Sequence, residues 1–522
     1  MRSSILFSTV SCLFLFGCGA EVNGTDPAGD EVETTSHALL APERSFAVTH
    51  QKFLKPFTLE RVLDQLVTLS GVTGLTALDL FQQMWDTQND TPNAAGPGPH
   101  CDDQLTWQGV PGLNDFPWEC PRFGGYQATI DPFGSDPLFI PIGLFNRFDL
   151  APATGAHCGE YRIVFAQQPG HPLALGNGRN FIIFEAILPN PNPHLGLAAC
   201  EPVAKLWHDF TFMSDASMAG ALEKFYFDGL FGFKPVVHPH HFGLMLGANG
   251  YACSSGQIRT NQFNADPWTM REYKLALDCR CGPCDLRMIP LTVKTNPYPE
   301  LFASATIHPL ATTLHSTVVS EIGPLSANDP NRISWSVDDK LNAAESPIDV
   351  FSDYTFQASG NPALHSAITM ALPAGSPLTS TNIIDRALTQ SCAGCHLLSD
   401  GRNLGDGVVW PFSLGFTHIS EFITMSGEYP ISQALQDVFI PFREQILLDF
   451  LANPHAFPGS GARCELQLPP DLVVPPDLCA EVLKDVELLP SLTAELSNHT
   501  GTLRKLRVQW EGRTILGRRS GH

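Results

Sequence analysis

Positive charge is scarce in this sequence. The 522 residues include 31 Lys and Arg against 53 Asp and Glu, and charged residues make up only 16% of the chain. Nucleic-acid binding depends on Lys and Arg side chains that neutralise phosphates. The charge balance therefore excludes nucleic acid as the expected partner.

Common catalytic signatures are missing as well. The chain has no GxSxG elbow, no Walker loop, no HExxH pair and no GxGxxG turn after a strand. The familiar hydrolases and nucleotide-binding enzymes are therefore not indicated. An enzyme of another kind stays open.

Long apolar runs are absent beyond the first residues. The run from Ile5 to Phe16 follows Arg2 and is too short to span a membrane as a stable helix, so it predicts an export signal. The end of this segment, "LFGC", resembles the lipobox of bacterial lipoproteins. That resemblance implies that residues 1–18 form a lipoprotein signal, that Cys18 carries the lipid, and that Gly19 directs the protein to the outer membrane, facing the periplasm or the exterior. A plain signal peptide with a chance cysteine is the alternative.

The composition behind the signal predicts a tether and a large body. Residues 19–40 carry five acidic side chains and no basic one, as in an acidic flexible linker. The 43 Gly, 43 Pro and 34 Phe of the chain favour short strands and long loops. Apolar spacing predicts two helices within residues 57–88, and residues 100–300 consist mainly of predicted strands. We therefore expect an α+β or mainly β body over residues 41–375.

The pattern of apolar residues changes near residue 375. The stretches "STNIIDRALTQ" and "ISQALQDVFIPFREQILLDFL" have helical spacing, and the sequence between them is irregular and rich in Gly. We expect a separate all-α module at residues 376–455 and a C-terminal extension at residues 456–522. The predicted fold class is thus multidomain, with a disulfide-braced body and a small helical module.

Fourteen cysteines in an exported chain indicate a disulfide framework. Short separations favour three pairs, and four further cysteines would pair among themselves. The expected pairs are Cys101 with Cys120, Cys158 with Cys200, and Cys464 with Cys479, and the remaining group is Cys253, Cys279, Cys281 and Cys284. Zinc or an iron-sulfur cluster at "CRCGPC", residues 279–284, is the weaker alternative because the export signal places the chain in an oxidising compartment.

Histidines cluster in "HPHH", at His238, His240 and His241. They could supply metal ligands, but they lack a carboxylate or a second histidine pair at helical spacing. We interpret them as a loop bent by proline and expect no metal to bind there.

The motif that indicates chemistry is "CAGCH", residues 392–396. Covalent haem c needs two thiols spaced to meet the two vinyl groups and a histidine that ligates the iron. Cys392, Cys395 and His396 meet that requirement. The export signal agrees, because in bacteria this haem is attached outside the cytoplasm.

Residues 380–453 resemble a small c-type cytochrome domain. In that family a first helix ends at the haem motif, an irregular loop wraps the haem edge, and a last helix packs across the first. The resemblance implies one covalent haem c, attachment at Cys392 and Cys395, axial ligation by His396, and electron transfer with an unidentified redox partner.

The sixth ligand departs from the family pattern, because a cytochrome methionine usually lies further downstream than Met425. His418 lies in "WPFSLGFTHISE" and is our preferred candidate, with Met425 as the other. Methionine would raise the reduction potential and a histidine pair would lower it. The iron could also keep an open position for peroxide or a small gas.

Two other functions stay open at this point. In the first, the protein is a haem-dependent oxidoreductase or a peroxidase-like enzyme whose chemistry lies in or beside the large body. In the second, the protein is a haem-free surface lipoprotein for binding or structure, and Cys392 and Cys395 form a small disulfide loop.

Overall fold

The computed structural model describes most of the chain between residues 40 and 455. The described ranges are 40–90, 99–246, 252–254, 256–263, 267–278, 285–304 and 306–455. The predicted signal, the lipid site Cys18, the tether and the C-terminal extension lie outside them. The predicted pairings of Cys464 with Cys479 and among the cysteines at 253 and 279–284 lie outside the described side chains as well.

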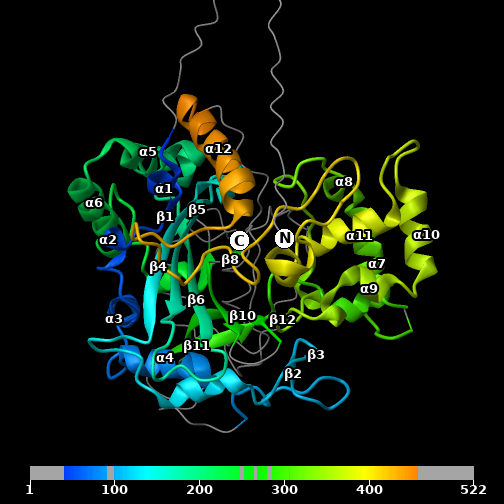
Figure 1. Cartoon of the computed structure of the whole chain (residues 1–522), viewed down its shortest axis with the longest axis horizontal. Helices are drawn as coiled ribbons and strands as arrows, with labels where there is room; N and C mark the ends of the chain where they lie inside the picture. The colour runs from blue at the N-terminus through cyan, green and yellow to red at the C-terminus, as the bar shows by residue number, and fades with distance from the viewer. Residues whose placement is uncertain are drawn as a thin grey trace, which may run out of the picture. The chain divides into compact units, whose positions relative to one another are not determined.

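The described part of the chain contains a large antiparallel sheet (Figure 1). Its strands follow the order β1, β4, β5, β6, β9, β10 and β11, and β12 pairs with β10. The bounds are β1 Ala47–Val48, β4 Phe139–Arg147, β5 His157–Gln167, β6 Arg179–Pro189, β9 Gln257–Phe263, β10 Thr269–Asp278, β11 Asp285–Leu291 and β12 Ser346–Pro347. Two short ribbons accompany the sheet: β2 Gly112–Leu113 with β3 Phe116–Pro117, and β7 Leu244–Leu246 with β8 Ala252–Ser254.

The two strands at the middle of the sheet are those with the clearest sequence signal. "EYRIVFAQ" ends β5, and "NFIIFEAILP" makes up nearly all of β6. The two strands are antiparallel neighbours, and every residue of β5 is buried, so β5 is covered on both faces. Alternate residues of β5 point to opposite sides. Tyr161, Ile163 and Phe165 lie on one side, and Glu160 and Arg162 lie on the other, where their buried charges need partners inside the protein.

Some helices pack on this sheet, and others form a group in which they pack on one another. Their bounds are α1 Pro42–Ser45, α2 Gln51–Leu54, α3 Leu59–Ser70, α4 Ala77–Asp86, α5 Glu201–Asp209, α6 Asp215–Phe227, α7 Ala311–Ser320, α8 Ile322–Leu325, α9 Tyr354–Ala358, α10 Pro362–Ala371, α11 Ser380–Leu388 and α12 Ile440–Ala452. α3 and α4 fall within the range in which the sequence predicts two helices. α3 ends at Gly71, whose backbone is in the left-handed conformation, and α4 begins at a capping box formed by Thr76. These two end signals explain why the chain forms two helices there and not one. None of the helices in the described ranges is long and apolar enough to cross a membrane.

Two predicted disulfides are confirmed. Cys101 is bonded to Cys120 and Cys158 to Cys200. The second bond ties β5 to the start of α5 across 42 residues of chain. The coarse prediction of a disulfide-braced α+β fold is therefore confirmed.

The two helices of the expected all-α module have different main neighbours. α11 packs against α8, α9 and α10, whereas α12 packs against α5 and the short helix η2, Phe148–Leu150. The same hydrophobic core contains Leu188 of the sheet and Leu388 of α11. The packing of a last helix across the first, as in a small cytochrome, is therefore not shown.

Candidate functional site

The "CAGCH" motif follows α11 and forms a tight turn. A Cβ atom at Gly394 would overlap the backbone carbonyl of Leu388, so only glycine fits at this position. The Ser391 hydroxyl accepts the backbone N–H of Gly394 at 2.9 Å, and the Ser391 carbonyl accepts that of Cys395 at 3.0 Å. A short π-helix, η9 (Gly394–Leu398), then carries His396. The sequence around the motif thus builds a rigid, buried turn.

Two contacts fix this turn to the body. The backbone N–H of Cys392 donates to Asn296 Oδ1 at 3.3 Å, and that of Ala393 donates to Ser346 Oγ at 3.2 Å. Ser346 belongs to β12, which pairs with β10 of the sheet. The position of the motif is therefore set by the sheet as well as by α11.

The two cysteines of the motif are buried thiols that form no disulfide. Cys392 lies in an apolar cluster with Trp268, Met270 and Val293. Cys395 faces a different environment, since its Sγ lies 3.5 Å from Nε2 of His418. The two thiols are thus inequivalent in this structure.

His396 is oriented for ligation. Its Nδ1 donates a hydrogen bond to the carbonyl of Phe416 at 2.8 Å, and Trp268 packs on its ring with centres 5.1 Å apart. Donation from Nδ1 leaves the lone pair on Nε2, the tautomer that a metal requires. Burial lowers the pKa of His396 to about 4, so the ring is neutral at physiological pH.

The structure brings His418, and not Met425, to His396. The two imidazole centres lie 5.0 Å apart at an interplanar angle of 61°. Nδ1 of His418 contacts the Ser432 hydroxyl at 2.8 Å, and burial lowers the pKa of His418 well below its ordinary value. The side chain of Met425 is fully exposed on the surface.

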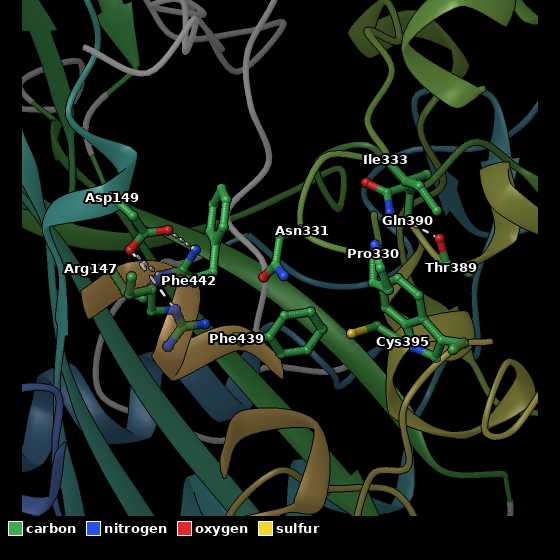
Figure 2. Close-up of a pocket in the computed structure, with 12 residues that line it drawn as sticks. Arg147, Asp149, Pro330, Asn331, Ile333, Thr389, Gln390, Cys395, Phe439 and Phe442 are labelled. Carbon is green, nitrogen blue, oxygen red and sulfur yellow. Dashed lines mark hydrogen bonds and ion pairs between the residues drawn. The ribbon is translucent and has the colours of Figure 1, made fainter. Parts of the chain in front are cut away.

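Two neighbouring cavities border this cluster. The first, of about 530 Å³, is lined by Cys395 and by residues from several elements, and Figure 2 shows the Cys395 sulfur pointing toward Phe439, with Arg147 and Asp149 farther away on the same side. The second, of about 550 Å³, is lined by His396 and His418. These volumes include space that connects to solvent. The candidate attachment thiol and the candidate ligands therefore line adjoining spaces.

The two cavities share Arg147 and Arg443. Sequence reasoning missed both residues. A signal was present, because Arg443 stands among Phe, Ile and Leu on the predicted last helix and is the single basic residue there. A cation on a helix that must be buried indicates an internal partner.

The other candidate metal ligands form no site in the described part of the chain. His240 and His241 lie in the short helix η5 (Pro239–His241), and His238 precedes it as its N-cap. The ring of His238 lies 4.8 Å from that of His240 and 5.2 Å from that of His241. Burial lowers the pKa of His241 to about 3. The described residues hold no group of three or more His, Cys, Asp or Glu side chains placed to bind a metal ion.

The donor set fits a haem c at three points. These are the Nε2 lone pair of His396, the neutral ring of His418 beside it, and the Cys395 thiol at a cavity. Two points differ. The rings of His396 and His418 are in edge-to-face contact, with centres 5.0 Å apart, so they would have to move apart to hold a metal ion between them. Cys392 lies in the cluster with Trp268 and is not among the cavity-lining residues.

Comparisons with models of known protein families, with curated proteins and with solved structures return no match for this chain.

Proposed function

We propose that the chain carries one covalent haem c and acts in electron transfer. The observation that supports this most is that His418, from a later loop, lies beside His396 of "CAGCH", and that these residues and Cys395 line two adjoining cavities. Cys392 and Cys395 would hold the porphyrin, and His396 and His418 would ligate the iron. When bound, haem c supplies a reversible one-electron couple.

The residues around the site prepare it for this role. Phe416 keeps the ligating tautomer of His396, and burial keeps both imidazoles neutral, so neither ring must lose a proton before it binds a metal. The position of His418 favours a six-coordinate iron, which suits electron transfer better than reaction with peroxide. A redox partner would supply or accept the electron.

The same proposal includes an anchor. Lipid on Cys18 would hold the protein at the outer membrane, behind the acidic tether of residues 19–40. Radiolabelled palmitate should enter the parent chain and not Cys18→Ala.

The haem proposal is tested by expression in a host with haem-attachment machinery. The parent protein should give a pyridine haemochrome spectrum with one haem per chain that acid-acetone does not extract. The Cys395→Ala variant should lose most of the covalently bound haem. The matched control is the double variant Cys101→Ala/Cys120→Ala, which removes a disulfide but leaves the motif intact. A parent chain without covalent haem would overturn the proposal.

The distal ligand is tested on the same samples. His418→Ala should convert a low-spin optical spectrum into a high-spin spectrum that shifts when cyanide is added. Met425→Ala should leave the spectrum unchanged, since that side chain is exposed. A high-spin parent that binds cyanide would favour the peroxidase-like alternative.

One observation favours a second candidate, a haem-free dithiol. Nε2 of His418 lies 3.5 Å from Cys395 Sγ, and Nδ1 of the same ring contacts Ser432. An imidazole can accept the thiol proton and raise its reactivity. Exchange with an external disulfide would then join Cys392 and Cys395 in a disulfide, and the external disulfide would take up the two electrons and two protons and leave as two thiols. Haem-free protein in which thiol trapping shows a reversible Cys392–Cys395 disulfide would support this candidate.

A further inference from the structure

We propose that the turn of residues 422–427, "FITMSG", inserts its apolar side chains into the surface of the bilayer to which the chain is anchored. The inference goes beyond the haem and rests on the lipid anchor of the proposed function. It gives the folded body a membrane contact of its own, and the partner is a phospholipid bilayer.

Three large apolar side chains gather at this turn. Phe422 is 59% exposed, Ile423 is 44% exposed and Met425 is fully exposed. The six residues of the turn carry no charge. Single exposed apolar residues are normal on a protein surface, whereas an uncharged cluster of three within four positions marks a contact with a protein or a membrane.

Hydrogen bonds fix the shape of the turn. The backbone N–H of Thr424 donates to the carbonyl of Glu428 at 2.8 Å, and that of Gly427 donates to the carbonyl of Thr424 at 3.0 Å. The Thr424 hydroxyl donates to the same Glu428 carbonyl at 3.0 Å. Gly427 has a φ of +88°, a left-handed conformation that favours glycine. The apolar side chains are therefore presented on a preformed turn, which lowers the entropy cost of binding.

The turn is attached to the segment with which the described chain begins. The backbone N–H of Gln51 donates to the carbonyl of Gly427 at 2.8 Å, and that of Tyr429 donates to the carbonyl of Thr49 at 3.2 Å. Thr49 follows Leu40, the first described residue, by fewer than ten residues. Chain geometry therefore keeps Thr49 within about 35 Å of Leu40.

The length of chain before Leu40 allows the turn to reach the membrane. Residues 19–39 separate the predicted lipid site, Cys18, from Leu40. A segment of this length spans at most about 75 Å, more than the largest separation of Thr49 from Leu40. The lipid and the turn can thus meet the same bilayer. The anchor would give the turn a high local concentration of lipid, so that even weak insertion is effective.

The surroundings of the turn favour a bilayer over a protein as the partner. A specific protein interface buries roughly 800 Å² on each partner, and three side chains are too few to fill it. A bilayer accepts projecting apolar groups without a matching shape. Charge adds little, because Lys52 beside the turn pairs with Asp215 at 2.8 Å and the whole chain has a net charge of −22. Insertion therefore depends on apolar area and should resist salt.

The first experiment is an oxidative footprint with an internal control. The chain from Gly19 to His522, which carries neither signal nor lipid, is treated with chloramine-T with and without vesicles of phosphatidylethanolamine and phosphatidylglycerol. Methionine sulfoxide is then located by mass spectrometry. Met370 is the control, because it is 78% exposed and lies on α10. When most of the protein is bound, oxidation of Met425 should slow at least about fivefold, and that of Met370 should stay unchanged.

The second experiment measures sedimentation of the same chain with these vesicles. Phe422→Ser should lower the partition coefficient about tenfold, because the inserted ring is lost. The matched control is Phe351→Ser, since Phe351 is 63% exposed and belongs to the short helix η8, Val350–Ser352. That variant should bind as the parent does. Both positions are exposed, and an unchanged melting midpoint confirms that each variant is folded.

Met425 that stays reactive on the vesicles would overturn the bilayer as the partner. Equal losses in Phe422→Ser and Phe351→Ser, or binding that high salt abolishes, would overturn the turn as the site of insertion. The anchor is read separately through palmitate on Cys18. A labelled chain with an unprotected Met425 refutes the turn alone, and an unlabelled chain with a protected Met425 refutes the anchor alone.

Discussion

Replacing Asp149 with Asn tests whether the charge network beside the cavities is buried as described. Asn keeps the shape of the side chain and removes its charge. Asp149 is 7% exposed and accepts two bonds of 2.9 Å from Arg147. The variant would leave Arg147 without its carboxylate and Arg443 without the attraction of Asp149. Removing one partner of a buried ion pair lowers the free energy of unfolding by about 3 to 5 kcal/mol. We expect the free energy of unfolding to fall by that amount.

The assay is urea unfolding near neutral pH, with Asp353→Asn as the control. Asp353 forms an ion pair with Arg402 at 2.6 Å, but both side chains are partly exposed. Solvent screening limits such a pair to roughly 1 kcal/mol. Equal losses in the two variants, or a loss below about 1 kcal/mol for Asp149→Asn, would refute the reasoning that burial sets the energy.

Three further outcomes are expected. Removing the bond between Cys158 and Cys200 with alanines should lower the free energy of unfolding by about 4 kcal/mol in chemical denaturation, since the closed loop spans 42 residues; a loss below about 1 kcal/mol would contradict this. Gly394→Ala should reduce both the melting midpoint and the yield of haem-loaded protein, because the new Cβ overlaps the Leu388 carbonyl; an unchanged midpoint would show that the turn is not rigid. Burial lowers the pKa of His157 from 6.5 to about 4, so the unfolded chain binds more protons between these values and stability falls as pH drops through this window. His157→Gln should reduce the loss between pH 7.5 and pH 5 by about 2 kcal/mol, and the same pH dependence in parent and variant would exclude this role.

Local sequence patterns were enough for several elements of the fold. Three- and four-residue spacing predicted helices where α3 and α4 occur, because one face of each packs on the core. β-branched and aromatic runs predicted strands where β5 and β6 occur. The two disulfides followed from short separation in the chain.

Arrangements that depend on distant parts of the chain could not be predicted. β6 pairs with β9 across the segment that holds α5, α6 and the small ribbon, and nothing local encodes that pairing. The main packing of α12 against α5 and η2 was missed for the same reason. A hydrophobic stripe shows that a helix is buried, but many apolar surfaces could cover it.

The candidate site, too, was predictable where a local sequence pattern defines it and not where distant parts of the chain meet. The spacing of Cys392, Cys395 and His396 carries its own chemical meaning, so the sequence indicated a haem motif. His418 was chosen over Met425 from loop composition, and the structure places it beside His396. The arginines around the cavities were missed. Arg443 stands out as a basic residue on an apolar helix, but its place beside Arg147 depends on a strand and a helix that lie far apart in the chain.

The central claim, covalent haem at "CAGCH", is tested most directly by mass spectrometry of the peptide that contains residues 392–396. The protein should be isolated from a host with haem-attachment machinery and digested without prior reduction. The account predicts that this peptide carries the mass of one haem through thioether bonds and shows haem absorbance. A peptide of unmodified mass, or one that differs only by the two hydrogens lost in a Cys392–Cys395 disulfide, would contradict it.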